Sequence, residues 1–490
     1  MLQDFYLRLK EIYHLGCIQE LLGWDQQVNL PPQSGEGRAA QLELMSKITH
    51  DRVTNPEFLA LVENLQSQID TLSPDDQLNV RETFRSQQRE RRLPTTFVAE
   101  QARAHAEGYQ RWVEAKPKND FAAITPSLER IVALARQESD LVGFEGSPYN
   151  ALFDKYEPYG RIETVRPLLL KLADALKDII PPVSEQFASV RPFTVNVDQS
   201  IQARINVRVA REVGYSFERG RLDAAPHPFM TTLGSRDQRI TTRYHEKDFL
   251  SSLFSTLHEA GHALYEAGCR EDMAGTPLGR FASLGVHESQ SRLWENLVGR
   301  SRAFAKYLHT ILQQEAPTLG RVLSEDELWK QLNRVKPSFI RVEADEVTYS
   351  LHVVIRMLLE EQLVSGALSV RDLPEAWNAL YQRYLGIQPP TFGMGVMQDV
   401  HWFSGSIGYF PTYVLGNLYG ASFMQAARKA LPDLDRSIEQ GQFAGLLGWL
   451  RENIHQHGMR YQGPELVRRL TGEEATEQPF LRYLREKFTV

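Results

Sequence analysis

Two histidines and a glutamate at helical spacing could hold a metal ion and activate a water molecule. His258, Glu259 and His262 lie in the segment FLSSLFSTLHEAGHALYEAG, whose apolar residues recur at the spacing of an α-helix. Residues four positions apart stand about one turn apart, roughly 6 Å along the axis, so both imidazoles can reach one cation. Glu259 then points at whatever else that cation binds. This His-Glu-x-x-His pattern is typical of zinc hydrolases.

A catalytic zinc needs a third protein ligand, which this helix cannot supply. Catalytic sites hold zinc with three protein ligands and keep one position open. Glu266 is on the same side of the helix, but it lies about 12 Å from His258 along the axis. We expect the ligand to come from a second helix, LGVHESQSRLWENLVG, after a turn containing glycine and proline. Glu288 is the predicted ligand, with Glu295 and His287 as the alternatives.

Five sequence strings together resemble one enzyme family. HEAGH and HESQSRLWEN lie in the two helices, and three further strings are DQRIT at Asp237–Thr241, IRVEAD at Ile340–Asp345 and GVMQDVHW at Gly395–Trp402. With these strings the chain resembles the carboxypeptidase Taq family of thermostable metallocarboxypeptidases. The resemblance implies a mostly α, neurolysin-like metallopeptidase with a deep groove. It also implies release of C-terminal amino acids from peptides with broad specificity.

The resemblance assigns roles outside the two helices as well. His401 and Tyr409, in the glycine-rich segment Leu385–Pro411, match the family's pattern and are expected to assist catalysis as donors to the developing oxyanion. Arg341 and Arg239 match family motifs and are expected to bind the substrate's terminal carboxylate through a bidentate fork. The residues expected to orient these groups are Asp237, Thr241 and Asp345.

These residues predict hydrolysis of an amide bond. A zinc held by two imidazoles and a carboxylate lowers the pKa of its water to about 7, and Glu259 would serve as the general base. A zinc oligopeptidase or endopeptidase would use the same core. An aminopeptidase would need acidic residues for the substrate amine, and the Gly-x-Met-Glu-Asn motif is absent. A structural metal would have a fourth protein ligand and no need for Glu259.

The composition is that of a folded protein without a charge signature for nucleic acid or membranes. The 490 residues are 42% hydrophobic and 24% charged, and the formal net charge is -7. No stretch of 18 apolar residues occurs, the first residues lack the apolar core of a signal peptide, and two cysteines imply no disulfide framework. We therefore expect a cytoplasmic enzyme acting on peptides. The resemblance adds a homodimer and activation by cobalt in place of zinc.

Helix signals dominate the chain around these strings. The apolar stripe of residues 2–22 predicts a first helix, and WDQQVNLPPQSGEG after it predicts a loop. Asn55 before Pro56 and Ser73 before Pro74 predict two helix starts, and Ser324 with Glu327 predicts a capping box. We expect one mostly helical domain over residues 1–490.

Residues 190–246 differ in composition from the helical segments and predict a small sheet. The segments RPFTVNV, HPFMTTL and RITTRY are rich in Thr, Val and Phe, and a turn at Gly234 to Asp237 separates the last two. We expect an antiparallel sheet inserted just before the metal helix and beside the active site. Such a sheet could bind the substrate as an added strand.

Overall fold

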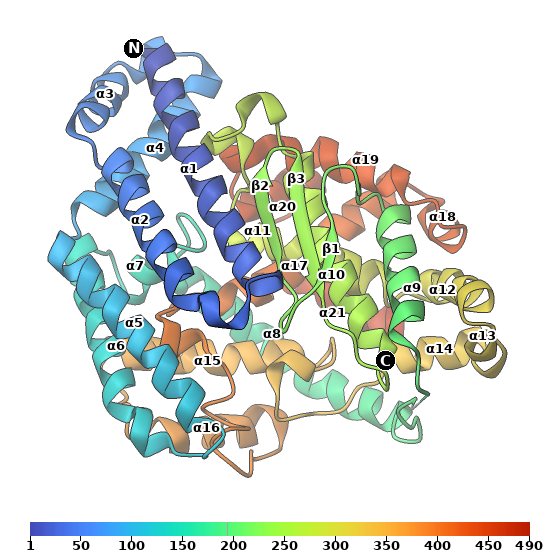
Figure 1. The fold of residues 1–490 in the computed structure, drawn as a ribbon. Coiled ribbons are helices and arrows are strands. Elements are labelled where there is room, and N and C mark those ends of the chain that lie inside the picture. The colour runs from blue at the N-terminus through green and yellow to red at the C-terminus, as the bar shows by residue number, and fades with distance from the viewer. Residues whose placement is uncertain (194) are drawn as a thin grey trace.

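The computed structural model describes residues 1–193 and 195–490, as helices packed around one small sheet (Figure 1). The helices of the first half are α1 (Leu2–Val28), α2 (Gly35–Val53), α3 (Pro56–Ser67), α4 (Pro74–Arg91), α5 (Thr95–Ala115), α6 (Phe121–Val142), α7 (Tyr149–Phe153), α8 (Ile162–Gln186), α9 (Gln199–Glu212) and α10 (Phe249–Gly268). Those of the second half are α11 (Leu284–Arg292), α12 (Arg302–Glu315), α13 (Pro317–Val322), α14 (Glu325–Leu332), α15 (Tyr349–Ser365), α16 (Leu373–Leu385), α17 (Pro411–Ala430), α18 (Leu434–Glu439), α19 (Ala444–Asn453), α20 (Gly463–Thr471) and α21 (Gln478–Phe488).

The predicted helix starts are confirmed. Asn55 accepts a hydrogen bond from the backbone N–H of Phe58, and Ser73 accepts one from Asp76. Both contacts of the capping box at Ser324 are present. These side chains satisfy amide groups that have no partner within the helix, which is why local sequence locates the starts.

The first helix is longer than predicted. α1 continues to Val28, so Trp24 and Asp25 are helical where a loop was predicted. Trp24 is buried, with the Arg239 guanidinium 4.4 Å from its ring centroid, and Asp25 pairs with Arg38 at 2.6 Å. Contacts made far along the chain therefore stabilise the last turns of α1.

The sheet has three strands in the order β1-β3-β2 and is mixed, so the prediction of an antiparallel sheet was wrong. The strands are β1 (Leu222–Ala224), β2 (Met230–Gly234) and β3 (Asp237–Thr242). β2 and β3 form the predicted antiparallel hairpin, whereas β1 runs parallel to β3. No local turn joins two parallel neighbours, so the sequence carries no short-range signal for that pairing.

The region before the sheet also differs from the prediction. α9 occupies residues 199–212, and the predicted strand over residues 191–197 does not form among the described residues of that segment. Thr194, which belongs to that predicted strand, lies outside the described residues. The insertion is therefore a helix followed by a short sheet.

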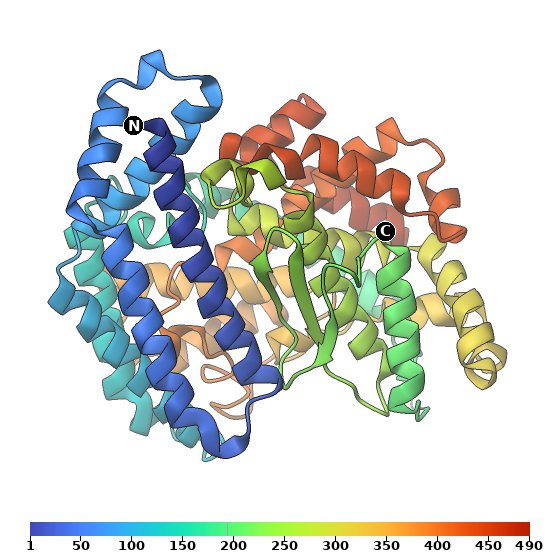
Figure 2. The same ribbon diagram turned by 45° about the horizontal axis from the view of Figure 1, so that its top comes forward.

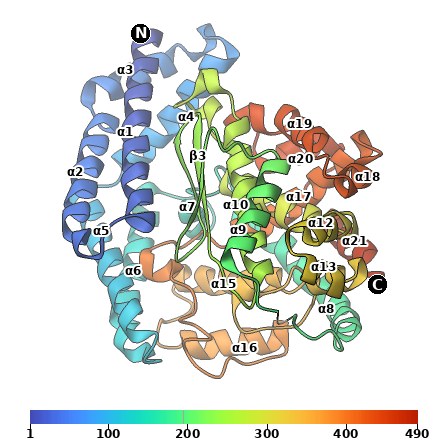
Figure 3. The same cartoon turned by 45° about the vertical axis from the view of Figure 1, so that its right-hand side comes forward.

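The sheet lies between α1 and the metal-motif helix α10, as the turned views show (Figures 2 and 3). On one face Ile240 packs with Ala260 and Ala263 of α10. On the other face Thr231 donates a hydrogen bond to Glu20 of α1 at 2.9 Å. The sheet thereby fixes α10 relative to the N-terminal helices. Among the described residues, no helix has both the length and the apolarity needed to cross a bilayer.

Candidate metal centre

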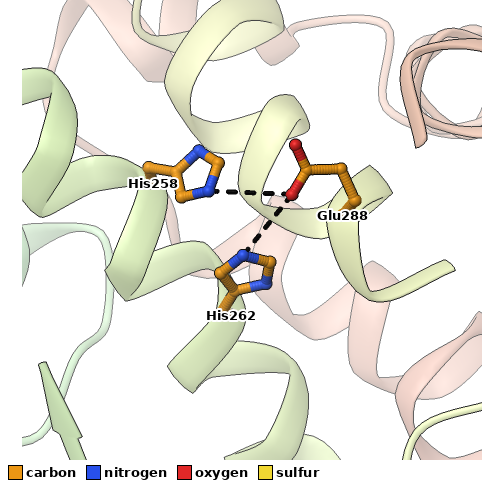
Figure 4. A group of neighbouring side chains, drawn as sticks. All are labelled: His258, His262 and Glu288. Carbon is orange, nitrogen blue, oxygen red and sulfur yellow. Dashed lines mark ion pairs between the residues drawn. The ribbon is translucent and has the colours of Figure 1, made fainter. Parts of the chain in front are cut away.

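His258 and His262 of α10 and Glu288 of α11 bring three ligand atoms together (Figure 4). Oε2 of Glu288 lies 3.7 Å from Nε2 of His258 and 3.5 Å from Nε2 of His262. All three ligand atoms lie within 4.8 Å of one another. Ligand atoms around a tetrahedral zinc are about 3.3 Å apart, because each bond is roughly 2.0–2.1 Å long. The three side chains therefore fit a zinc-sized cation.

Glu295 and His287, the alternative ligands, lie beside the cluster and contact its histidines. Oε2 of Glu295 is 2.9 Å from Nδ1 of His258, the ring nitrogen that faces away from Glu288. The ring of His287 stacks on His262, with centroids 4.2 Å apart, and its Nε2 is 3.0 Å from Oε1 of Glu266. A carboxylate on the second nitrogen of a histidine fixes its tautomer and leaves Nε2 free for a metal.

Arg292 joins the two carboxylates of this centre. Its Nε donates to Oε1 of Glu288 at 3.0 Å, and its Nη1 donates to Oε2 of Glu295 at 3.2 Å. Although burial opposes ionisation, Arg292 and His258 hold the pKa of Glu295 well below its usual range. Arg292 therefore keeps Glu295 charged and fixes the oxygen of Glu288 that points away from the histidines.

Two glycines let α10 and α17 approach α11 closely. A Cβ on Gly261 of α10 would lie 2.7 Å from the carbonyl oxygen of Gln290 and 2.7 Å from Cα of Ser291. A Cβ on Gly416 of α17 would lie 2.6 Å from Cγ of Glu288. These two contacts have no room for a side chain, so they set the distance between Glu288 and the two histidines.

Gly261→Ala should move α11 away from α10 and weaken metal binding. The added methyl group meets backbone atoms, and overpacking of this kind costs about 1–3 kcal/mol. Thermal unfolding and a metal titration would measure both effects. Gly448→Ala in α19 is the control, because nothing lies within 4 Å of the added Cβ. Unchanged stability and metal affinity in Gly261→Ala would contradict this account of the helix contact.

Glu259 lies beside the cluster with its carboxylate unengaged. Its side chain is buried, yet no hydrogen bond to its carboxylate occurs among the described parts of the chain. It lines, with His258 and Glu288, a cavity of about 760 Å³. Burial raises the pKa of the Glu259 carboxyl to about 7, close to the value at which a general base works best at neutral pH.

The cavity extends away from the metal ligands between several helices. Its walls include Phe254 of α10, Leu332 of α14, Tyr349 of α15, Tyr413 of α17 and Phe488 of α21. Charged and polar side chains, such as Lys247, Arg334 and Glu343, line the cavity away from the cluster as well. This mixture of apolar and polar walls is expected of a site that orients a peptide by polar contacts.

Arg341 lines the same cavity and shares a carboxylate with Arg356. Its Nε and Nη2 donate to Oδ1 of Asp399 at 3.0 and 2.8 Å, and Nη1 donates to Tyr349 at 3.0 Å. Arg356 donates from Nε to Oδ2 of the same aspartate at 2.6 Å. These three side chains together carry one net positive charge. Arg356 lies inside the long helix α15, and no sequence motif pointed to it.

His401 and Tyr409 lie close to each other behind the cavity wall. Their ring centroids are 5.5 Å apart, and Tyr413, which sequence reasoning missed, lies 3.2 Å from Nε2 of His401. Tyr413 itself lines the cavity, whereas His401 and Tyr409 are not among its lining residues. Burial and the charge of Glu288 raise the pKa of Tyr409 to about 12. Burial, with Arg341, lowers the pKa of His401 to about 4. At neutral pH Tyr409 is thus a hydroxyl donor and His401 is uncharged.

The structure does not bring Arg239, Asp237 and Thr241 to this cavity. Arg239 forms a bidentate pair with Asp237, with both N–O distances 2.9 Å, and stacks on Trp24. Thr241 binds the backbone of Phe229. Asp345 does line the cavity, and its carboxylate accepts hydrogen bonds from the backbone ahead of α15.

The chain is similar to known proteins over nearly its whole length. The sequence model of the carboxypeptidase Taq (M32) metallopeptidases matches residues 4–488. Thermostable carboxypeptidase 1 of Thermus thermophilus is 41% identical over 98% of this chain and 96% of its own, and carboxypeptidase 1 of Bacillus subtilis is 36% identical over 99% and 98%. The M32 carboxypeptidase structure from Deinococcus radiodurans superposes with a TM-score of 0.96 at 40% identity, covering 99% of this chain and 98% of that one.

Proposed function

The chain belongs to the carboxypeptidase Taq (M32) family and is a metallocarboxypeptidase; we propose that it releases C-terminal amino acids from peptides with broad specificity. The observation that most supports this proposal is the cluster of His258, His262 and Glu288 at a cavity that His258 and Glu288 line together with Arg341. Family membership favours this activity over the oligopeptidase that the sequence left open.

We propose zinc as the metal, with cobalt as a substitute. Two imidazoles and one carboxylate match the donors that catalytic zinc sites use, and they leave one coordination position open. Zinc bound there would act as a Lewis acid and lower the pKa of a water molecule to about 7. Glu295 would hold His258 in the tautomer that leaves Nε2 free.

The chain's own groups would carry the protons and the developing charge. Glu259 would take the proton of the attacking water on its carboxylate and deliver it to the leaving amine. Tyr409, and with it Tyr413, would donate hydroxyl hydrogen bonds to the oxygen that gains negative charge, since burial keeps both hydroxyls protonated. His401 would orient Tyr413 through its Nε2.

The terminal carboxylate of the substrate would bind beside Arg341. Asp399 balances only one of the two guanidinium groups that it contacts, so these three side chains retain one positive charge beside the cavity. Arg341 also keeps N–H groups on Nη1 and Nη2 beyond those donated to Tyr349 and Asp399. Arg239 is a weaker candidate for this role, because its Nε and Nη2 already donate to the carboxylate of Asp237.

Peptides with an amidated C-terminus should be poor substrates. An amide offers no bidentate anionic acceptor, so the loss is expected to be on the order of 2 kcal/mol or more of transition-state stabilisation. Arg341→Ala should lower kcat/KM for peptides with a free C-terminus, and it should reduce the ratio of kcat/KM between free and amidated peptides. Arg239→Ala should leave that ratio unchanged. Kinetics on matched free and amidated peptides measure both effects.

Mass spectrometry of a mixed peptide digest, with and without added metal, tests the function itself. Ladders shortened from the C-terminus are expected, and only with metal. Internal cleavage that is equally fast for free and amidated peptides would contradict the carboxypeptidase proposal and favour the oligopeptidase.

The organisation of the protein completes the proposal. We propose a homodimer in the cytoplasm and a single domain over residues 1–490, as the family resemblance and the helix pattern imply. The main apolar core supports the last of these for the larger part of the chain, because it runs from Ala115 of α5 to Phe488 of α21, whereas α1, α3 and α4 pack around a second, smaller core. Light scattering in solution would test the dimer.

A further inference from the structure

One buried carboxylate holds the glycine-rich segment at two points. Oε1 of Glu360, on α15, accepts the indole N–H of Trp402 at 2.7 Å. Oε2 accepts the backbone N–H of Gly408 at 3.2 Å and the hydroxyl of Tyr149 at 2.6 Å. Trp402 follows His401 and Gly408 precedes Tyr409 in the sequence. Each oxygen of Glu360 therefore fixes the neighbour of one proposed catalytic side chain.

The backbone at Gly408 is also confined on its other side. Gly408 has a φ of +94°, and a Cβ there would lie 2.9 Å from backbone atoms of Leu152 and Phe153. α7, which contains both residues, also supplies Tyr149 to Glu360. The segment before Tyr409 is thus clamped between α7 and α15, and Glu360 contacts both parts of the clamp.

α15 presents a row of polar side chains toward this segment. Arg356, one turn before Glu360, binds Asp399, and His352, one turn earlier, has its Nδ1 3.0 Å from the hydroxyl of Tyr381. All three α15 side chains are fully buried. A buried polar group is retained at a cost unless it is hydrogen-bonded, and the Glu360 carboxyl has three donors.

We propose that Glu360 is a positioning residue for the reaction, acting through the Gly408 backbone to hold Tyr409 beside Tyr413 of the cavity wall, so that the Tyr409 hydroxyl can donate to the developing oxyanion. The inference rests on the proposed function of Tyr409. A shift of about 1 Å at such a donor can lower turnover by about a hundredfold while ground-state binding changes little. Loss of the clamp should therefore reduce kcat more than it changes KM.

The test is a double-mutant cycle between Glu360→Gln and Tyr409→Phe in the metal-loaded full chain. Glutamine keeps the size of the side chain but replaces one acceptor oxygen with an NH2 group. Glu360→Gln should lower kcat at least about tenfold, with KM within about twofold and metal content unchanged. In Tyr409→Phe the same change should have little further effect, because it acts through the hydroxyl that is missing. The control is Glu361→Gln, next along α15 and paired with Arg166 at 3.5 Å, which should leave kcat unchanged.

The possible failures are distinguishable. If Glu360→Gln lowers kcat by the same factor in the Tyr409→Phe background as in the parent protein, the positioning role is wrong. A normal kcat in Glu360→Gln alone would also overturn it. Normal activity of Tyr409→Phe alone would instead overturn the proposed role of Tyr409. If Glu360→Gln does not fold, Tyr149→Phe removes only the hydroxyl that donates to the same oxygen of Glu360 as the Gly408 N–H. It should then lower kcat without releasing metal, and a normal kcat in that variant would also overturn the inference.

Discussion

Replacing Glu259 with glutamine is expected to lower kcat by at least about a hundredfold while the protein still binds roughly one metal ion per chain. Glutamine has nearly the same shape but cannot accept the proton of the attacking water. The carboxylate has no hydrogen-bond donor among the described residues, so the substitution breaks no contact that supports the metal ligands. Steady-state kinetics and metal analysis of the same preparation measure the two quantities together.

The control for that result is Glu271→Gln, at an exposed carboxylate that pairs with Arg236 outside the cavity. Its activity should equal that of the parent protein. A metal-loaded Glu259→Gln protein with near-normal turnover would show that another group takes the proton, and the assignment of the general base would have to be abandoned.

Glu288→Ala is expected to weaken metal binding about as severely as His258→Ala or His262→Ala. It removes one of three donors, whereas the loss of a group that only orients a ligand typically costs about 10–100-fold in affinity. Glu295→Ala removes the partner of His258, and its loss of metal affinity should lie within that roughly 10–100-fold range. Competition with a chromophoric chelator gives the affinities of all four variants.

The comparison between Glu288 and Glu295 decides between the two turns of the second helix. Loss of metal in Glu295→Ala with normal binding in Glu288→Ala would contradict the ligand set proposed here. Arg292 contacts both carboxylates, so Arg292→Ala would not distinguish the role of Glu288 from that of Glu295.

The metal cluster could be predicted because its signals are local. His258 and His262 are joined by one helical turn, and Glu288 lies in α11, the next α-helix along the chain. The partners of the ligands were harder to foresee. The pairing of Glu288 with Arg292 follows helical i, i+4 spacing, but Arg356 meets Asp399 only through the tertiary fold. No spacing rule links residues that far apart in sequence.

The fold was predictable to the same extent and for the same reason. Helix starts at Asn55, Ser73 and Ser324 depend on side chains within three residues, and they are where the sequence placed them. The parallel strand β1 and the last turns of α1 depend on contacts across the chain. Leu222 of β1 stands opposite Ile240 of β3, and Trp24 is covered by arginines of the sheet region, and neither contact has a sequence-local signal.

The placement of α11 between Gly261 of α10 and Gly416 of α17 has a consequence for how the protein folds. Between α11 and Gly416 the chain forms α12 to α16, so the contact of α17 with α11 closes a long loop. The entropy cost of closing that loop comes before any gain from the contact. We therefore expect the metal cluster to assemble late, as part of the global transition. A metal that binds only the native state adds about 1.4 kcal/mol to the free energy of unfolding for each tenfold rise in its concentration above Kd. Metal supply then contributes to the stability of the entire fold as well as to the activity of the site.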